Sequence, residues 1–284
     1  MTLNQALHLA EHKLVAANIE DASFEAEWLL CHVLQISKAG LYSNPERALR
    51  SAEVRKLQHL VWRRLHHEPM AYILECCQFY GIDFYVDGRV LIPRPETELL
   101  VEEAIQFARH DFPLGRQPAI ADIGTGSGAI AVSLALALPQ AVIYATDISP
   151  SALQVARTNC ERHKVDGRIT LLCGNLLQPL PKPVDMIVAN LPYVRSCDLS
   201  TLSQEITRFE PTTALAGGED GLGMIRCLLN QLQGRLYPGG CLLLEVGQGQ
   251  AEAVRSLANN YLPQANTKSI ADLGGIDRAI KVML

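Results

Sequence analysis

A glycine-rich segment near the middle of the chain has the composition of a ligand-binding loop. Asp122 to Gly128 (DIGTGSG) ends one apolar run and precedes a second, helix-like one. Glycines let the backbone turn sharply and approach a ligand, and the start of a helix offers N–H groups that have no partner within the helix. Asp147 ends the next apolar run, where a carboxylate can accept hydrogen bonds from both ribose hydroxyls. The pair predicts a nucleoside-containing cofactor, and the alternative is a purely structural turn between strand and helix.

The spacing of the glycines separates two candidate cofactors. A dinucleotide site usually has the pattern G-x-G-x-x-G, whereas this loop has G-x-G-x-G. Asp122 lies immediately before the loop, where a carboxylate would repel a pyrophosphate and attract the amino group of a methionine moiety. The pattern therefore favours S-adenosylmethionine over a dinucleotide.

A second segment, Asn190-Leu191-Pro192-Tyr193, follows a later apolar strand-like run. Ligands of open α/β sheets bind at the carboxyl ends of strands, so this tetrapeptide is expected to face the same crevice as the glycine loop. Asn190 offers a side-chain carbonyl, the residue before the proline has a restricted backbone carbonyl, and Tyr193 offers an aromatic face. These groups can hold a planar NH₂ group, although a simple turn after a strand would have a similar sequence.

Holding a planar NH₂ group has a chemical purpose. The lone pair of an amide or aromatic amine nitrogen is delocalised, so this nitrogen is a weak nucleophile. Two acceptors for its hydrogens return electron density to the nitrogen, direct the lone pair, and stabilise the positive charge that develops in the transition state. The tetrapeptide therefore predicts methyl transfer to such a nitrogen, with no strong general base required.

The elements that must position these residues differ between the two ends of the chain. The N-terminal part predicts a helical bundle. Its second helix carries Phe24, Trp28, Leu29 and Val33 as the apolar face. Residues 78–93 alternate aromatic and β-branched side chains and predict a β-hairpin that turns at Asp87-Gly88. Apolar runs alternating with helical segments then predict a parallel α/β sheet, closed by a C-terminal hairpin. The strands are expected at 119–123, 141–146, 168–173, 184–190, 240–246, 265–272 and 278–284.

The composition excludes several classes of protein. The chain has 284 residues, 48% of them hydrophobic and 19% charged, which is typical of a globular protein and excludes a disordered chain. A formal net charge of -5 disfavours binding of nucleic acid through the whole surface. The sequence shows no signal peptide, no membrane-spanning run and no metal-ligand spacing among its cysteines and histidines. We expect a cytoplasmic monomer with reduced cysteines and no membrane partner.

One helix of the N-terminal part is locally basic. It contains Arg47, Arg50, Arg55, Lys56, Arg63 and Arg64. This pattern indicates either a solvated helix face or a docking surface for an acidic protein partner.

Taken together, these segments resemble the release factor glutamine methyltransferases, the PrmC/HemK family. The resemblance covers nearly the whole chain and rests on several specific stretches: 68–74 (EPMAYIL), 90–102 (VLIPRPETELLVE), 122–132 (DIGTGSGAIAV), 208–215 (RFEPTTAL), 217–226 (GGEDGLGMIR) and 239–250 (GGCLLLEVGQGQ). It implies methylation of the side-chain amide nitrogen (N5) of the glutamine in the Gly-Gly-Gln motif of bacterial peptide chain release factors, with S-adenosylmethionine as the methyl donor and S-adenosylhomocysteine as the product.

The resemblance also implies an arrangement of domains. An N-terminal helical substrate-recognition domain would span residues 1–75 and a β-hairpin linker residues 76–93. A Rossmann-like, seven-stranded class I methyltransferase domain would span residues 94–284. Release factors would be the protein partner, and direct binding of nucleic acid is not expected.

The family pattern assigns roles to individual residues of this sequence. The cofactor would be held by Asp122, Gly124, Thr125, Gly126, Ser127, Gly128, Asp147, Ile148, Asn175, Leu176 and Asn190. The reacting amide would be gripped by Asn190, Leu191, Pro192 and Tyr193, the catalytic segment, while Phe209, Glu210 and Pro211 would shape the substrate site.

The chain departs from the family pattern in places. Leu191 replaces the usual first proline of Asn-Pro-Pro-Tyr, which keeps the backbone carbonyl and loses the ring that restricts the backbone. Asn175 stands where Asp is frequent, and Glu75-Cys76-Cys77 stands where a glycine is more usual. The alternatives are an adenine-N6 methyltransferase of DNA or RNA, a glutamine methyltransferase of a ribosomal protein, and a non-enzymatic adenosine-binding regulator.

Overall fold

A computed structural model describes residues 1–111 and 117–284, which divide into two compact units. The first unit comprises residues 1–76 and 203–209, and the second comprises residues 77–202 and 210–284. The first unit is therefore discontinuous, because a short segment from the middle of the chain joins the N-terminal helices.

The first unit is entirely helical, as expected for the N-terminal part. Its first helix begins with a capping box, in which the Thr2 hydroxyl accepts from the Gln5 backbone N–H and the Gln5 side chain accepts from the Thr2 N–H. The helices are α1 (Leu3–Ala16), α2 (Ala22–Leu34), α3 (Lys38–Ser43), α4 (Ser51–Leu65), α5 (Met70–Leu74) and α9 (Gln204–Phe209).

The buried face of α2 differs from the expected one. Ala22, Ala26, Leu29 and Leu30 are buried, whereas Phe24 is 56% exposed and Trp28 is 47% exposed. Leu29 is buried as expected. Small alanine side chains let neighbouring helices approach closely, so the packed face carries Ala22 and Ala26 beside the leucines, and the two aromatic residues lie outside it. The Lys38 ammonium lies over both exposed rings, 4.9 Å from the Phe24 centroid and 5.9 Å from that of Trp28.

The expected β-hairpin is present, but its turn lies elsewhere. The strands β1 (Cys77–Phe79) and β2 (Ile82–Phe84) pair antiparallel and connect through Tyr80 and Gly81, whose φ angles are +51° and +70°. Two consecutive positive φ angles are what a two-residue hairpin turn needs. The predicted turn at Asp87-Gly88 is thus wrong: the Asp87 carboxylate accepts from the Arg89 N–H at 3.0 Å and closes a separate local turn after the hairpin.

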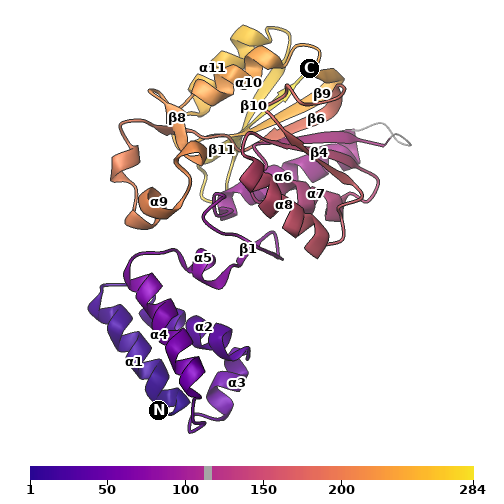
Figure 1. The fold of residues 1–284 in the computed structure, drawn as a ribbon. Coiled ribbons are helices and arrows are strands. Elements are labelled where there is room, and N and C mark those ends of the chain that lie inside the picture. Colours follow the sequence, from indigo (N-terminus) through magenta and orange to yellow (C-terminus); the bar gives the residue numbers. More distant parts are fainter. Residues whose placement is uncertain (112–116) are drawn as a thin grey trace. The chain divides into compact units, whose positions relative to one another are not determined.

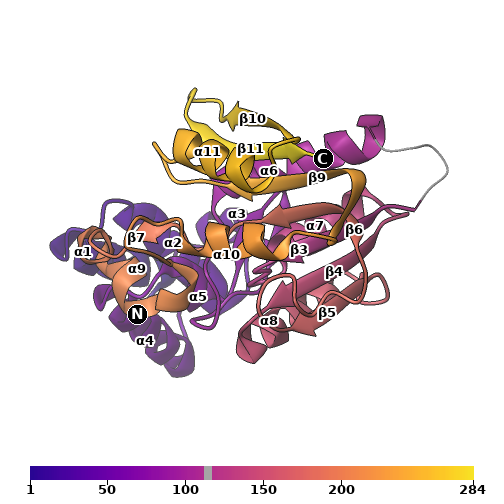
Figure 2. The same ribbon diagram turned by 90° about the horizontal axis from the view of Figure 1, so that it is seen from above.

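The second unit is built on a seven-stranded sheet with the order β10-β11-β9-β6-β3-β4-β5 (Figures 1 and 2). Strands β9, β6, β3, β4 and β5 are mutually parallel, and β11 runs antiparallel to both of its neighbours. The bounds confirm the predicted strands and the C-terminal hairpin. The strands are β3 (Ala119–Ile123), β4 (Val142–Asp147), β5 (Ile169–Cys173), β6 (Val184–Ala189), β9 (Leu236–Glu245), β10 (Asn266–Ala271) and β11 (Asp277–Met283).

Helices cover both faces of this sheet, so each strand alternates between two separate cores (Figure 1). In β3, Ile120 belongs to one core and Ala121 and Ile123 to the other. One face packs against α6 (Glu98–Gln106), α7 (Ala129–Ala137) and α8 (Pro150–Arg162), and the other against α10 (Gly223–Gln231) and α11 (Ala251–Tyr261). Burial on both faces explains why the central strands β3 and β6 are mostly apolar.

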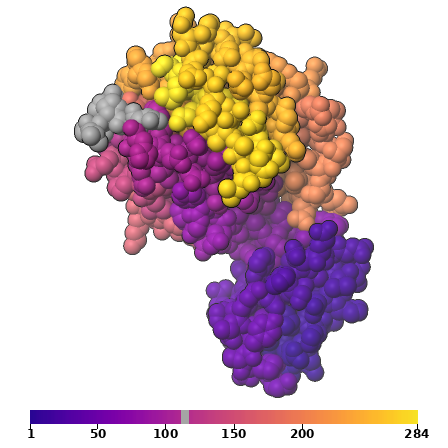
Figure 3. Space-filling view, turned by 180° about the vertical axis from the view of Figure 1, so that it is seen from behind, coloured from indigo at the N-terminus to yellow at the C-terminus, as the bar shows by residue number. Residues whose placement is uncertain are grey.

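Shorter elements complete the second unit. The strands β7 (Val194–Arg195) and β8 (Ala216–Gly218) form a small parallel pair beside the main sheet. Short 3₁₀ helices lie at Pro95–Thr97, Leu199–Thr201 and Thr212–Ala214, and a π-helical turn spans Phe107–Asp111. Figure 3 shows the yellow C-terminal segment on the surface of this unit. Lys281 Nζ lies 3.9 Å from Glu103 Oε2 of α6. Within the described residues, none of the helices has both the length and the apolar character that crossing a membrane requires.

Candidate active site

A pocket of about 400 Å³ lies at the carboxyl ends of the parallel strands in the second unit. This volume is in the range of small-molecule and cofactor sites, roughly 300–1,000 Å³. It brings together residues from the glycine loop, the ends of β4, β5 and β6, and the segment before α10. The predicted site residues that line it are Gly124, Gly126, Asp147, Ile148, Asn175, Leu176, Asn190, Leu191, Pro192 and Pro211.

Other predicted site residues are absent from the lining. These are Asp122, Thr125, Ser127, Gly128, Tyr193, Phe209 and Glu210. Four of them, Asp122, Thr125, Ser127 and Glu210, are buried. Among the described residues, His, Cys, Asp and Glu side chains form no group of three or more that could hold a metal ion.

Two of the three glycines in the loop serve different purposes. The N–H of Gly126, which lines the pocket, donates to Asp147 Oδ2 at 2.9 Å. Gly128 has φ +81°, and a Cβ there would lie 3.3 Å from the backbone of Ala156 in α8. Gly128 therefore permits the loop to pack closely on α8, whereas Gly126 lines the pocket.

Asp147 connects the end of β4 to the loop. Its Oδ1 accepts from the Ser149 N–H at 2.8 Å, while Oδ2 accepts from Gly126. Each carboxylate oxygen can accept more than one hydrogen bond, so both can still accept from a ligand hydroxyl. Burial raises the pKa of this carboxyl, and the backbone N–H groups oppose that rise. The group has the position and the remaining acceptor capacity that the ribose role requires.

Asp122 lies behind the loop and is completely buried. Its Oδ2 accepts from the Thr125 hydroxyl at 2.6 Å and the Ala131 N–H at 3.1 Å. Its Oδ1 has no hydrogen-bond partner among the described residues. Burial raises the pKa of Asp122 to about 7, because the site disfavours an unneutralised charge. A cation in the neighbouring pocket, such as the amino group of a methionine moiety, would stabilise the ionised carboxylate and lower this pKa, so the residue fits that group electrostatically.

The tetrapeptide after β6 is held by side chains from distant parts of the chain. Asn190 Nδ2 donates to Thr97 Oγ1 at 2.9 Å, and the Tyr193 hydroxyl donates to Glu245 Oε1 at 3.3 Å. The Tyr193 carbonyl accepts from Gln250 Nε2 at 3.0 Å. Sequence reasoning missed Thr97, Glu245 and Gln250, although a lone glutamate ending the apolar run LLLEV was a visible signal of a buried polar contact.

The backbone of the tetrapeptide is also closely enclosed. A Cβ on Gly217, in β8, would lie 2.7 Å from the Pro192 carbonyl oxygen and 2.8 Å from Tyr193 Cα. Only a glycine fits at that approach. Leu191 is buried and belongs to the core that the sheet forms with α10 and α11. Its side chain lies beside Gly124 of the glycine loop. The two predicted motifs are therefore in direct contact.

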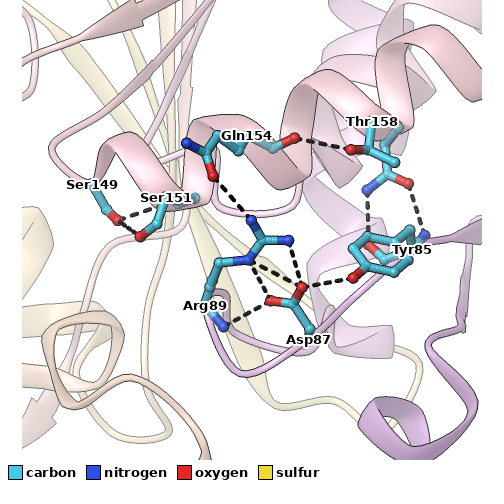
Figure 4. Close-up of polar contacts among 9 residues, drawn as sticks. Tyr85, Asp87, Arg89, Ser149, Ser151, Gln154 and Thr158 are labelled. Atoms are coloured by element: carbon cyan, nitrogen blue, oxygen red, sulfur yellow. Dashed lines mark hydrogen bonds and ion pairs between the residues drawn. The ribbon is translucent and has the colours of Figure 1, made fainter.

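A wall of the pocket comes from residues 88–91, which sequence reasoning had assigned to the hairpin. Arg89 donates to both oxygens of Asp87 and to Gln154 Oε1 of α8, at 3.1 Å for the latter (Figure 4). The Tyr85 hydroxyl donates to Asp87 Oδ2 at 2.8 Å, and Arg89 lowers the pKa of Asp87 to about 2. The network fixes this wall against α8. The other unexpected lining residues are Thr146, Ser149, Ser151, Ala152, Gly174, Thr213, Ala214 and Met224.

Residues 209–211 are divided between the two units: Phe209 belongs to the first, and Glu210 and Pro211 belong to the second. Pro211 lines the pocket, whereas Phe209 ends α9 in the first unit, beside Arg208. The buried Glu210 carboxylate accepts from the Ile92 N–H at 3.3 Å and pairs with the Arg94 guanidinium. Glu210 thus attaches the chain to the segment before α6, and its part in shaping the substrate site stays a prediction.

The basic helix α4 is only partly a solvated face. Arg64 is buried and pairs with Glu25 Oε2 at 2.6 Å and with Glu205 Oε1 of α9 at 2.7 Å, while Arg63 pairs with Glu68 at 2.6 Å. These ion pairs lie inside the first unit, and the Arg64–Glu205 pair attaches α9 to α4. Arg63 and Arg64 therefore serve internal packing.

Comparison with known proteins adds to this geometry. The PrmC N-terminal domain family matches residues 5–74, and the methyltransferase small domain family matches residues 97–213. A release factor glutamine methyltransferase of Geobacter sulfurreducens is 40% identical over 98% of this chain and 95% of its own length. One of Moorella thermoacetica is 42% identical over 98% of this chain and 97% of its own length.

Solved structures show the same fold at lower identity. A methyltransferase from Pyrococcus furiosus superposes with a TM-score of 0.52 at 18% identity, covering 72% of this chain and 89% of that one. The hMettl16 catalytic domain superposes with a TM-score of 0.55 at 16% identity, covering 82% and 81%. These likenesses confirm a class I methyltransferase fold. With the full-length similarity to the curated relatives, they show that the chain belongs to the release factor glutamine methyltransferase family.

Proposed function

We propose that this protein transfers a methyl group from S-adenosylmethionine to the side-chain amide nitrogen of the glutamine in the Gly-Gly-Gln motif of peptide chain release factors. The observation that carries the proposal is the single pocket that joins Asp147 and the glycine loop to Asn190 and Pro192. Membership of the release factor glutamine methyltransferase family supports the choice of substrate.

The cofactor half of the pocket would hold S-adenosylmethionine, which supplies an electrophilic methyl group on a sulfonium. Asp147 would accept from the ribose hydroxyls through the acceptor capacity left on its two oxygens. The orphaned Oδ1 of Asp122 lies behind the loop and would stabilise the amino group electrostatically. Asn175, Leu176 and Ile148 line the same cavity and would enclose the adenosine.

The substrate half would hold the glutamine amide. Asn190 Oδ1 and the Leu191 backbone carbonyl would accept the two N–H hydrogens, which increases electron density on the nitrogen. Both acceptors would also stabilise the positive charge that develops on this nitrogen. Positioning of this kind lowers a barrier by up to roughly 7–11 kcal/mol in the ideal case. The proton can leave to solvent after transfer, when the nitrogen is strongly acidic.

The first unit would recognise the protein substrate. This proposal follows the domain arrangement with residues 1–75 as the recognition part, residues 76–93 as the linker and residues 94–284 as the catalytic part. It is supported by the match of residues 5–74 to the PrmC N-terminal domain family. The exposed aromatic side chains of Phe24 and Trp28 offer contact area on this unit.

Mass spectrometry tests the proposal directly. A bacterial release factor is incubated with the purified enzyme and S-adenosylmethionine, digested and mapped. We expect a gain of one methyl group on the peptide with the Gly-Gly-Gln motif, and none when its glutamine is replaced by alanine. Methylation of DNA, RNA or a ribosomal protein in place of the release factor would contradict the proposed substrate.

A further inference from the structure

Two buried side chains from distant segments, Thr97 and Glu245, form a hydrogen-bonded series that ends at the partly buried Asn190. Asn190 Nδ2 donates to Thr97 Oγ1 at 2.9 Å, and the Thr97 hydroxyl donates to Glu245 Oε2 at 2.5 Å. The Tyr193 hydroxyl reaches the other oxygen, Glu245 Oε1, at 3.3 Å. Thr97 is 5% exposed and Glu245 is 3% exposed, so water does not readily replace these contacts.

The chemistry of Glu245, Thr97 and Asn190 gives the series a direction, because it determines which group donates and which accepts at each contact. An ionised carboxylate can only accept, so the Thr97 hydroxyl hydrogen must be given to Glu245. The Thr97 oxygen is then left as an acceptor toward Asn190. Asn190 must therefore offer its NH₂ group to Thr97, and its carbonyl oxygen Oδ1 is turned to the other side. A carboxylate in the interior thus determines which end of a distant amide is presented.

We propose that Thr97 and Glu245 are positioning residues, which hold the Asn190 amide in the one orientation whose Oδ1 can accept from the substrate amide. The inference rests on the proposed function and deepens it. In the flipped orientation, the Asn190 NH₂ group would face the substrate NH₂ group, and two donors would oppose each other. The other effect of Glu245 is to fix Tyr193, whose ring adjoins Gly247.

The ionisation of Glu245 also makes this hydrogen-bonded series sensitive to pH. Burial is the largest influence and raises the pKa of Glu245 to about 7, while Thr97 and Tyr193 oppose this by donating to it. The charged groups that face it are Glu96, which raises the pKa further, and Arg278, which lowers it. When Glu245 is protonated it can itself donate to Thr97, and the direction of the series is lost. Activity should therefore fall as the pH drops through this pKa.

The test compares Thr97→Val, which removes the hydroxyl at nearly constant volume, with Thr97→Ser, which keeps it. We expect Thr97→Val to lower kcat by about 10–100-fold, the usual cost of removing a group that orients a functional residue. The KM for the release factor and the Kd for S-adenosylmethionine should change less than about threefold, because the lost group acts on the transition state. Thr97→Ser should restore kcat to within about threefold of the wild type.

Glu245→Gln provides a second readout that does not depend on Thr97→Val folding. A neutral amide can both donate and accept, so the direction is lost at every pH. We expect a lower kcat and the disappearance of the acidic limb of the pH profile near pH 7. Ser133→Ala is the matched control, because the Ser133 hydroxyl is buried in α7 without a hydrogen-bond partner among the described residues. It should leave kcat and the pH profile unchanged.

The outcomes separate this inference from the proposed function. If the wild type methylates the release factor and Thr97→Val or Glu245→Gln keeps the wild-type kcat and pH profile, the positioning role is wrong. A slow Thr97→Ser or a changed KM at constant kcat would also overturn it. If the wild type does not methylate the release factor, the proposed function fails, and the inference that rests on it fails as well.

Discussion

The two halves of the pocket are built in different ways. The cofactor half is made largely of local backbone: Gly126 and Ser149 donate N–H groups to Asp147, all within a short stretch of sequence. The substrate half depends on side chains from three distant segments, because Asn190 is held by Thr97 and Tyr193 by Glu245. Local chain geometry can thus form a nucleoside site, whereas the orientation of one reactive amide needs the whole fold.

The largest effect should come from the substrate half. Asn190→Ala removes an acceptor for the substrate amide, and we expect kcat to fall about 10²–10³-fold, the usual cost of losing one transition-state hydrogen bond. Binding of S-adenosylmethionine should fall by less than about threefold. Methyl transfer with an isotope-labelled cofactor measures the rate and calorimetry measures the affinity. Equal rates in the variant and the wild type would remove Asn190 from the mechanism.

The cofactor half should show the opposite signature. Asp147→Ala removes a carboxylate that accepts from backbone and, as proposed, from the ribose. Hydrogen bonds to a charged group contribute roughly 1.5–3 kcal/mol, so the Kd for S-adenosylmethionine should rise about 10–100-fold. At saturating cofactor, kcat should change much less than in Asn190→Ala. An unchanged Kd by calorimetry would refute the ribose assignment and with it the contrast between the halves.

A third variant examines the buried charge behind the loop. The pKa of Asp122 is raised to about 7 in the folded protein from an ordinary value of 3.8, so the folded state binds more protons than the unfolded state between these values. Stability without ligand should therefore decrease as the pH rises from about 4 to 7 through this group.

Asp122→Asn removes that titration and the unpaired charge. We expect the variant to be more stable than the wild type by about 1–2 kcal/mol at pH 8, with a smaller difference at pH 5.5, where the wild-type carboxyl is mostly protonated. It should also bind S-adenosylmethionine more weakly. Urea unfolding at the two pH values measures the stability. If the variant is destabilised equally at both pH values, the buried charge of Asp122 does not lower the stability of the wild type.

The smallest effect is expected for Leu191→Pro, which restores the usual residue of the family. The backbone carbonyl that would accept from the substrate is retained, so kcat should stay within about threefold and the product should be unchanged. The loss of the buried Leu191 side chain should lower stability by roughly 1–3 kcal/mol. Mass spectrometry of the product and a thermal melt measure these quantities. A different methylated atom would show that Leu191 takes part in substrate selection.

The sheet could be predicted from the sequence because strands buried on both faces are mostly apolar, and the fully buried β3 and β6 carry only one aspartate each. The hairpin turn could not, because Asp87-Gly88 is the stronger turn signal by composition, while Tyr80 adopts a positive φ that non-glycine residues rarely adopt. The buried face of α2 was misjudged because periodicity favours large residues, whereas close packing selected Ala22 and Ala26.

The candidate site, like the fold, could be predicted from the sequence only in part. The glycine loop, Asp147 and the tetrapeptide carry their chemistry in contiguous residues, so their meeting at one pocket could be anticipated from the rule for parallel sheets. Thr97 and Glu245 lie far from Asn190 in the sequence. The tertiary fold brings them near it, Thr97 from the 3₁₀ helix before α6 and Glu245 from the end of β9. No local pattern connects them, and the same holds for Arg89 and Gln154.

The excursion of residues 203–209 into the first unit has a practical consequence for dissecting the protein. A single cut after residue 76 would leave α9 with the catalytic part and separate Glu205 from Arg64. Neither fragment would then be a complete folding unit. The N-terminal fragment would keep the buried Arg64 guanidinium with Glu25 but without Glu205. The other fragment would keep α9 without the helices that it packs against. Exchanging recognition parts between relatives would accordingly require grafting the two stretches together.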